Sequence, residues 1–328
     1  MIDVHTHYLA EALVSAMTDR ADLPRISGSG DNRVIEYGQG NVHVLMPAMV
    51  DLERQEREMG EAGVTRAVLT VNLPGVDWFG AADGVAISRD VNDELAQLSR
   101  DQPSRISALA VLPMQAPTEA AAELERAVGQ GLRGAMIYSN IAGEPVDPVA
   151  LSELLDVAVA LDVPLTIHPT YPLSASTLDA YALIPTVGFL VDTTSAALRL
   201  ILGGAYEGRD SLQLVLCHAG SLLPQLVGRI DYEAERHGAH GLGALFGSAL
   251  PSERIELLYT DAVCASGHAL RNTLDLLGPD RVMFGSDYPF WQHERTYGAI
   301  EAAELSPEIA SRIRTENAER LFGPFAAA

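Results

Sequence analysis

The chain alternates short apolar segments with longer amphipathic or alanine-rich segments along most of its length. The short segments have the length and composition of buried strands, and the longer ones have those of helices. Regular alternation of this kind predicts βαβ units around a parallel sheet. The strand-like segments are residues 1–4, 66–71, 106–112, 134–138, 165–168, 212–217, 255–259 and 282–285. Eight such units predict an α/β fold of the (β/α)8 TIM-barrel type.

Several of the longer segments have the pattern of surface helices of a barrel. They are residues 51–62, 85–100, 118–130, 148–161, 222–237 and 268–277. Residues 21–49 interrupt the repeat, and we expect them to form a β-hairpin-like insertion after the first strand, able to cover the barrel mouth. Residues 169–189 are expected to form a long loop after the fifth strand. No linker divides the chain, so we predict one domain over residues 1–328.

Charge and composition exclude several classes of function. The formal charge is −22, from 44 acidic and 22 basic residues, and no basic run occurs, so nucleic acid and anionic membranes are not expected partners. No segment reaches the roughly 18 apolar residues of a membrane span, and a signal peptide is not recognisable, so we expect a cytoplasmic protein. All 22 basic residues are arginine. Without lysine, a Schiff base and a carbamylated lysine between two metals are excluded.

Four histidines and one aspartate fall at the carboxyl ends of predicted strands: His5, His7, His168, His218 and Asp287. In a barrel these ends face the same mouth. Three imidazoles and one carboxylate suit one Zn²⁺ ion per subunit, and Mn²⁺ or Fe²⁺ use the same residue types. His218 is either a fourth nitrogen ligand or a general acid or base. The other histidines are expected at solvated positions: His43, His237, His240, His268 and His293.

Motifs in the same order along the chain resemble those of the amidohydrolase superfamily. They are Asp3-Val4-His5-Thr6-His7, His168-Pro169, His218-Ala219-Gly220 and Gly285-Ser286-Asp287-Tyr288-Pro289-Phe290. They are most similar to its decarboxylase branch, typified by 2-amino-3-carboxymuconate 6-semialdehyde decarboxylase. The resemblance implies a mononuclear zinc site made by His5, His7, His168 and Asp287, with His218 as acid or base. It also implies that Arg229 lies near a substrate carboxylate, and that the protein is a homodimer whose partner lends an arginine.

The chain departs from that branch in two segments, which bears on the substrate. Residues 45–50 read Leu-Met-Pro-Ala-Met-Val, where the carboxymuconate enzyme carries an arginine followed by Asn-Cys-Trp. Residues 170–174 replace an aromatic-rich loop with Thr-Tyr-Pro-Leu-Ser. We therefore expect a less acidic substrate, such as a phenol with one carboxylate. Phe290 and Trp291 are candidates to stack on its ring and Tyr138 to hydrogen-bond to it, although packing within the barrel is the alternative.

Two reactions fit this set of residues. In a decarboxylase, a metal holds an oxygen next to the carboxylate, His218 delivers or steers a proton to carbon, and Arg229 anchors the carboxylate. The alternative for Arg229 is a salt bridge within its helix. In a hydrolase, the metal activates water to attack a lactone or amide, with Asp287 as base and His218 polarising the carbonyl. The resemblance favours a decarboxylase acting on a small carboxylic acid.

Overall fold

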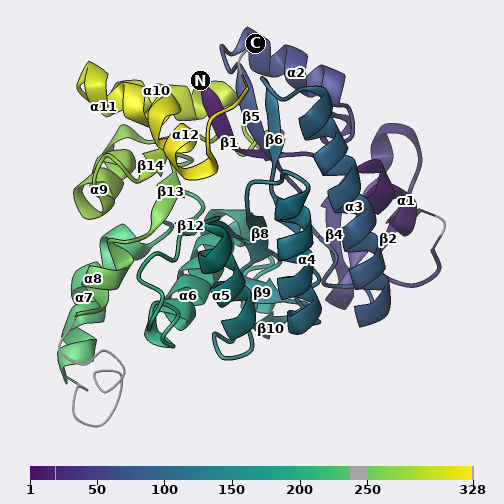
Figure 1. Ribbon diagram of the computed structural model, residues 1–328, viewed down its shortest axis with the longest axis horizontal. Helices are drawn as coiled ribbons and strands as arrows, with labels where there is room; N and C mark the ends of the chain where they lie inside the picture. The colour runs from purple at the N-terminus through teal and green to yellow at the C-terminus, as the bar shows by residue number, and fades with distance from the viewer. Residues whose placement is uncertain (19, 237–249, 327–328) are drawn as a thin grey trace.

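The computed structural model describes residues 1–18, 20–236 and 250–326 (Figure 1). The strands that follow the predicted repeat are β1 (Ile2–His7), β5 (Arg66–Thr70), β6 (Ile106–Ala108), β7 (Ala110–Val111), β8 (Ala135–Tyr138), β11 (Leu165–His168), β12 (Leu214–Leu216), β13 (Tyr259–Asp261) and β14 (Val282–Met283). β6 and β7 are two parts of the third predicted strand, interrupted at Leu109. Almost every residue of these strands is buried, which explains the short apolar runs of β5, β8, β12 and β14, while β1 and β13 also carry buried polar residues.

All of these strands pair in parallel, and their order follows the chain. One sheet has the order β1-β5-β6, and a second has the order β14-β13-β12-β11-β8-β7. The two sheets meet at the interrupted third strand, and the Val4 N–H donates to the Phe284 carbonyl oxygen at 3.0 Å between the first and last strands. The strands therefore follow one another in the circular order of a (β/α)8 barrel, and their carboxyl ends gather at one mouth.

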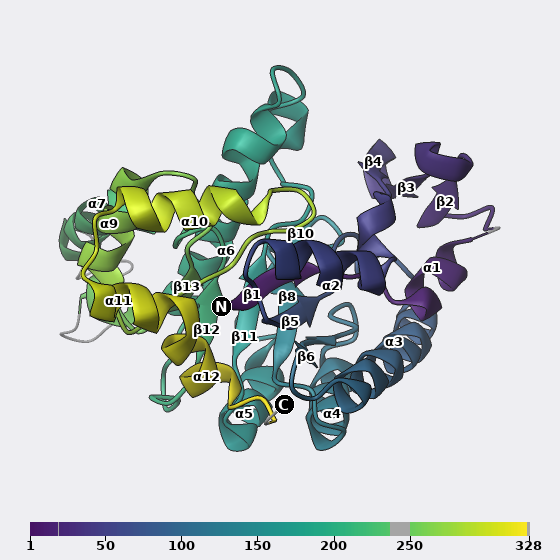
Figure 2. The ribbon, with the colours of Figure 1, turned by 90° about the horizontal axis from the view of Figure 1, so that it is seen from above.

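Helices cover the outside of this sheet system (Figures 1 and 2). They are α1 (Glu11–Met17), α2 (Leu52–Glu61), α3 (Ala81–Asp101), α4 (Pro117–Gly129), α5 (Ser152–Leu161), α6 (Phe189–Leu202), α7 (Leu223–Arg236), α8 (Pro251–Ile255), α9 (Gly267–Leu277), α10 (His293–Ala302), α11 (Pro307–Ser311) and α12 (Asn317–Phe322). The six predicted helices correspond to α2, α3, α4, α5, α7 and α9, and their predicted ends differ from the observed ones by about four residues or fewer. A short hairpin of β9 (Asn140–Ile141) and β10 (Glu144–Pro145) follows β8.

The seventh strand differs from its prediction. Residues 255–259 were expected to be extended, but Ile255 ends α8 and the strand begins only at Tyr259. The local chemistry explains the helix. Pro251 occupies its first turn, and the Glu253 carboxylate accepts a hydrogen bond from the Leu250 N–H at 3.1 Å.

The insertion has one strand more than a hairpin. β2 (Arg25–Ser27), β3 (Val34–Tyr37) and β4 (Asn41–Val44) form an antiparallel sheet in the order β2-β3-β4. β2 was not predicted because its three residues are all half-buried and show no alternation. Figure 2 shows this small sheet beside α1, at the edge of the molecule.

The segment after β11 is partly helical rather than an open loop. A π-helical turn at Ile184–Gly188 runs directly into α6. The combined helix, Ile184–Leu202, has a mean hydropathy of 1.2 over 18 residues, and 44% of that window is buried inside the protein. Its buried residues include Ala196, Ala197 and Leu200, which pack into the hydrophobic core. Packing against the barrel thus explains the apolar residues on the buried side of this helix, while Val187 and Val191 are exposed on its other side.

Asp77, in the loop between β5 and α3, is a buried carboxyl group. Its Oδ1 accepts a hydrogen bond from the Met114 N–H at 3.3 Å, and its Oδ2 has no hydrogen-bond partner among the described residues. Burial raises the pKa of Asp77 from 3.8 to about 7. The unfolded chain therefore loses this proton at lower pH than the folded protein does. As pH rises from about 4 to about 7, the folded state loses stability.

We expect Asp77→Asn to remove this pH dependence. At pH 8 the variant should be more stable than the parent, by at most about 4 kcal/mol, and the difference should shrink as pH falls toward 4. Urea unfolding at a series of pH values measures it, with Asp90→Asn, an exposed aspartate of α3, as control. Parallel pH profiles for the parent and Asp77→Asn would contradict the assignment.

Candidate metal centre

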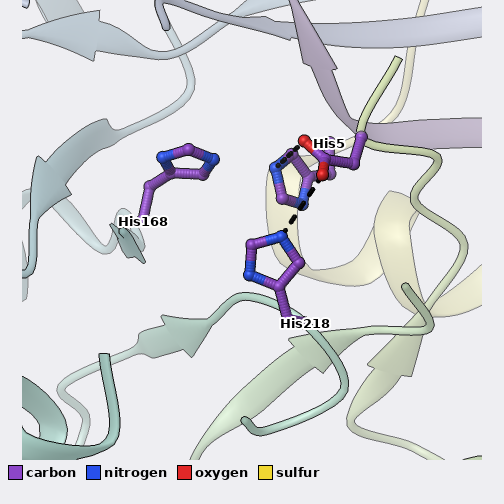
Figure 3. A group of neighbouring side chains, drawn as sticks. His5, His168 and His218 are labelled. Atoms are coloured by element: carbon purple, nitrogen blue, oxygen red, sulfur yellow. Dashed lines mark hydrogen bonds and ion pairs between the residues drawn. The ribbon is translucent and has the colours of Figure 1, made fainter. Parts of the chain in front are cut away.

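The structure brings together all five residues predicted at the strand ends. His5 and His7 lie on β1, His168 ends β11, and His218 and Asp287 follow β12 and β14. The Nε2 atoms of His5 and His7 are 3.2 Å apart, and His7 Nε2 is 2.9 Å from Asp287 Oδ1. Figure 3 shows the rings of His5, His168 and His218 around a common space. One ligand atom from each of His5, His168, His218 and Asp287 lies within 4.8 Å of the others.

Hydrogen bonds at the far side of each ring fix the tautomers of three of the histidines. His5 Nδ1 lies 2.8 Å from Asp261 Oδ2, and His168 Nδ1 lies 2.8 Å from the Pro169 carbonyl oxygen. His7 Nδ1 lies 3.0 Å from Thr70 Oγ1, whose own proton goes to the Thr6 carbonyl oxygen. Each Nδ1 therefore carries the proton, and each Nε2 presents a lone pair to the common space.

This donor set fits a divalent metal ion. His168 Nε2 is buried and has no hydrogen-bond partner among the described residues, as expected for a nitrogen reserved for a metal. Two Nε2 atoms 3.2 Å apart need a cation between them, either a proton shared by His5 and His7 or a metal ion. Three nitrogens and a carboxylate oxygen match the ligands of zinc and of other first-row divalent ions.

The pKa values of the buried groups decide which of them can bind a metal ion without first losing a proton. Burial, together with the neighbouring charge of His5, lowers the pKa of His7 to about 4. Burial and the adjacent His7 and His5 lower the pKa of His168 well below its usual value. Burial alone would raise the pKa of Asp287, but His5, His218 and His7 hold it well below its ordinary range. Burial alone would lower the pKa of His5, but Cys217, Asp287 and Asp261 hold it well above its usual value. The site therefore offers two neutral imidazoles, those of His7 and His168, and an ionised carboxylate near neutral pH, and a metal ion would displace a proton from His5.

Two buried carboxylates position the loops that carry His218 and Asp287. The Asp261 carboxylate accepts hydrogen bonds from the N–H groups of His218 at 3.0 Å and Val263 at 2.9 Å, in addition to binding His5. Asp3 accepts a hydrogen bond from the Ser286 N–H at 3.0 Å. His218 and Asp287 have φ values of 62° and 61°, a region that side-chain-bearing residues rarely adopt. The barrel thus holds both residues in strained conformations that aim them at the site.

Gly285 packs closely against His5 of β1 and against Asp261, and there is no room for a side chain at this position. A Cβ atom at this position would lie 2.9 Å from the Cβ atoms of both His5 and Asp261. We expect Gly285→Ala to lower stability by about 1–3 kcal/mol and to weaken metal binding, because His5 must shift. Thermal unfolding and metal analysis test this. Gly298→Ala, at a position in α10 with no neighbour within 4 Å, is the control and should unfold no earlier than the parent.

The cluster of candidate metal ligands borders a cavity of about 820 Å³. Its lining includes His168, His218 and Asp287, and also Phe290 and Trp291, as predicted for residues that contact substrate. The Phe290 ring lies 5.6 Å from the His7 ring, in an edge-on arrangement.

The other two substrate-binding candidates do not line this cavity. Arg229 lies on α7 with an exposed side chain. Tyr138 is buried, and its hydroxyl donates to the Val71 carbonyl oxygen at 2.9 Å, so its proton is used within the barrel. Phe290 and Trp291 thus line the cavity and Arg229 does not, whereas Tyr138 lies behind the cavity wall with its ring centroid 6.4 Å from that of His168.

His43 was expected to be solvated, but it lines the cavity. Its ring lies 5.1 Å from that of Phe290, and its Nε2 lies 3.2 Å from Asn72 Nδ2. Its position at the cavity could have been predicted, because His43 belongs to the insertion that was expected to cover the barrel mouth. His293 is also buried, stacked on Tyr288 at 4.8 Å, whereas His268 is exposed as expected. His237 and His240 lie outside the described residues.

Comparison with known proteins assigns this arrangement to a family. The family model described as "Amidohydrolase" matches residues 2–323. The chain belongs to the amidohydrolase family. This confirms the resemblance noted from the sequence motifs, and with it the (β/α)8 barrel.

The relatives of this amidohydrolase include several decarboxylases. The gamma-resorcylate decarboxylase of Polaromonas sp. is 31% identical over 300 residues, which cover 85% of this chain and 89% of that protein. The 2-amino-3-carboxymuconate-6-semialdehyde decarboxylase of Dictyostelium discoideum is 29% identical over 252 residues, covering 75% of this chain and 69% of that protein.

A solved structure extends the similarity to the three-dimensional fold. The dihydroxybenzoic acid decarboxylase of Polaromonas sp. JS666, with bound manganese and the inhibitor 2-nitroresorcinol, superposes with a TM-score of 0.81 and 26% identity. The similarity covers 98% of this amidohydrolase chain and 96% of that one.

Proposed function

We propose that this amidohydrolase is a metal-dependent, non-oxidative decarboxylase of a hydroxyaromatic carboxylic acid. The observation that carries the proposal is the set of Nε2 lone pairs facing the Asp287 carboxylate at the base of a cavity that also contains Phe290 and Trp291. The decarboxylases among its relatives support the same reaction class. Hydrolysis of a lactone or amide, which the ligand set alone also permits, is not favoured by these relatives.

The metal would be held by His5, His7, His168 and Asp287. Zinc suits three nitrogens and one oxygen, and the bound manganese of the Polaromonas structure supports manganese as the alternative. A divalent ion at this position supplies a positive charge that draws electron density from the substrate's oxygens during cleavage. We expect one ion per chain after reconstitution, with zinc or manganese identified by which of them restores activity.

The residues around the ion supply the proton transfers. Asp287 accepts the proton of the substrate hydroxyl adjacent to the carboxylate, which pushes electrons into the ring. Protonated His218, whose Nε2 lies 3.4 Å from Asp287 Oδ2, donates a proton to the ring carbon that bears the carboxylate. The carbon–carboxylate bond then breaks, CO2 leaves, and its electron pair restores the aromatic ring. Asp287 returns its proton to the phenolate oxygen, and solvent reprotonates His218.

A substrate panel tests this reaction. Protein loaded with Zn²⁺ or Mn²⁺ is incubated with hydroxybenzoates that differ in the position of the hydroxyl group, and CO2 release is measured. We expect release from acids with a hydroxyl next to the carboxylate, and loss of activity after chelation. Turnover of lactones or amides with no CO2 release from any acid would replace the proposal with a hydrolase.

We also propose that the protein is a homodimer. Apolar side chains are exposed on the segment between β11 and α6, namely Leu173, Tyr181 and Val187, and Tyr181 is 93% exposed. Exposed apolar groups clustered in this way are typical of an interface. Light scattering with size-exclusion chromatography should give twice the 35.0 kDa chain mass. Tyr181→Asp should shift the equilibrium toward the monomer, and a monomeric parent protein would contradict the proposal.

A further inference from the structure

The cavity is larger than a single-ring acid requires. Pockets of roughly 300–1,000 Å³ commonly hold drug-sized ligands, and this one, at about 820 Å³, lies near the upper end. A hydroxybenzoate has one ring and two short substituents, so most of the cavity would remain unfilled. The residues that line the rest of the cavity therefore indicate which substituents the substrate ring has.

The order of the strands around the barrel divides the cavity lining into two halves. Loops after β14, β1 and β5 are neighbours, and besides Asp287 they contribute Val42, His43, Asn72, Leu73, Phe290 and Trp291. The 5.1 Å separation of the His43 and Phe290 rings confirms that these residues lie together. Loops after β11, β12 and β13 form the opposite half, between the starts of α6, α7 and α9. The metal ligands come from both halves.

The second half is predominantly apolar. We call it the apolar half, and its apolar residues include Pro185, Phe189, Leu190, Pro224, Val263 and Ala269. Apart from His168 and His218, its polar side chains are those of Gln225, which is exposed, and of the hydroxyl residues Thr186, Ser221 and Thr273. Most hydroxyl groups nearby are already used by the protein. The Thr273 hydroxyl donates to the Ala219 carbonyl oxygen at 2.8 Å, the Thr186 hydroxyl to that of Ala182 at 2.7 Å, and the Ser221 hydroxyl to that of Cys217 at 3.0 Å.

The cavity also lacks a cation for a second acidic group. No arginine is among the described residues that line it, and the chain contains no lysine. A carboxylate transferred from water into an apolar pocket without a partner is strongly disfavoured. One carboxylate can be compensated at the metal centre, and a second, placed in the apolar half, cannot.

From these observations we propose that the substrate is a hydroxyaromatic acid with a single carboxylate and an apolar substituent, an alkyl chain or a second ring, that occupies the apolar half. This inference rests on the proposed function and adds the substrate class. The ring lies against His43, Asn72, Phe290 and Trp291, and the substituent extends between α6 and α9. Phe189, Leu190 and Ala269 are half-buried in the ligand-free protein, so a bound substituent would remove apolar surface from water.

Equilibrium binding of product-like phenols tests the inference independently of catalysis. Calorimetry with the metal-loaded protein would compare resorcinol with resorcinols that carry methyl, propyl and pentyl chains. We expect the affinity to rise by about fourfold for each buried methylene. A constant affinity across the series would overturn the inference. Affinity that rises with chain length, without CO2 release from the matching acids, would retain the inference and refute the proposed decarboxylation.

Substitutions at two neighbouring residues test where the alkyl chain binds. Leu190 lines the apolar half, whereas the adjacent Val191 is 37% exposed and is not among the lining residues. Leu190→Ser should lower the ratio of pentyl- to unsubstituted-resorcinol affinity by at least about tenfold, and Val191→Ser should leave that ratio unchanged. Ala269→Phe, which fills the same half, should also lower the ratio. Equal ratios in Leu190→Ser, Val191→Ser and the parent would show that the substituent binds elsewhere and overturn the proposal.

Discussion

Replacing His168 by alanine should leave the protein without a stably bound metal ion and reduce decarboxylation to the background rate. The His168 Nε2 atom is buried, has no hydrogen-bond partner among the described residues, and faces His5, His218 and Asp287. Loss of an outer-shell partner of a metal ligand costs roughly 10- to 100-fold in affinity, and loss of a ligand should cost more. Metal analysis of the dialysed variant, together with CO2 release, measures both effects.

His268→Ala is the matched control for this variant. His268 is a histidine at the start of α9 with an exposed side chain, and it takes no part in the cluster. The control should keep one metal ion per chain and the parent's activity. If His168→Ala retains both the ion and the activity, the ligand assignment is wrong.

Replacing His218 by alanine should lower kcat by about 10²- to 10⁴-fold, the usual contribution of a general acid. His218 Nε2 lies 3.4 Å from Asp287 Oδ2, and the backbone of His218 is held by Asp261, so the ring is fixed beside the proposed metal ligands at the wall of the cavity. The four proposed ligands, His5, His7, His168 and Asp287, are unchanged in this variant and should still hold the metal. Binding of a product-like phenol should therefore change much less than kcat.

Two measurements separate a catalytic role of His218 from a structural one. Added imidazole should restore part of the activity of His218→Ala, because a free imidazole can enter the space left by the ring. Metal content and the thermal midpoint of the variant should stay close to those of the parent. Loss of the metal in His218→Ala would instead identify His218 as an essential ligand.

The sequence predicts most of the barrel because its strands are buried on both faces. Such strands consist of continuous apolar residues, which are easily distinguished from the amphipathic helices between them. The prediction fails at residues 255–259, where an apolar pattern is shared by the end of α8 and the approach to β13. It also misses β2, whose pairing with β3 depends on contacts between residues distant in sequence, such as the 2.9 Å ion pair of Arg25 with Glu36.

The metal centre is predictable for a topological reason, and the rest of the cavity is not. Any residue that ends a parallel strand of the barrel reaches the same mouth, so His5, His168 and Asp287 can be grouped without knowing a single distance. His43 and Leu190 reach the cavity only through the folding of the insertion and of the segment before α6. Arg229, on an amphipathic helix, could face either way, and only the packing of α7 decides that its side chain is exposed.

Decarboxylation is tested most directly by following a ¹³C label in the carboxyl group of a 2-hydroxybenzoate. Carbon NMR would compare metal-free protein, the same protein loaded with Zn²⁺ or Mn²⁺, and loaded His218→Ala. If the protein is a metal-dependent decarboxylase, labelled CO2 and bicarbonate will appear only with the loaded parent protein. Label that stays in the acid under all conditions, while the loaded protein hydrolyses a lactone or amide, would contradict it.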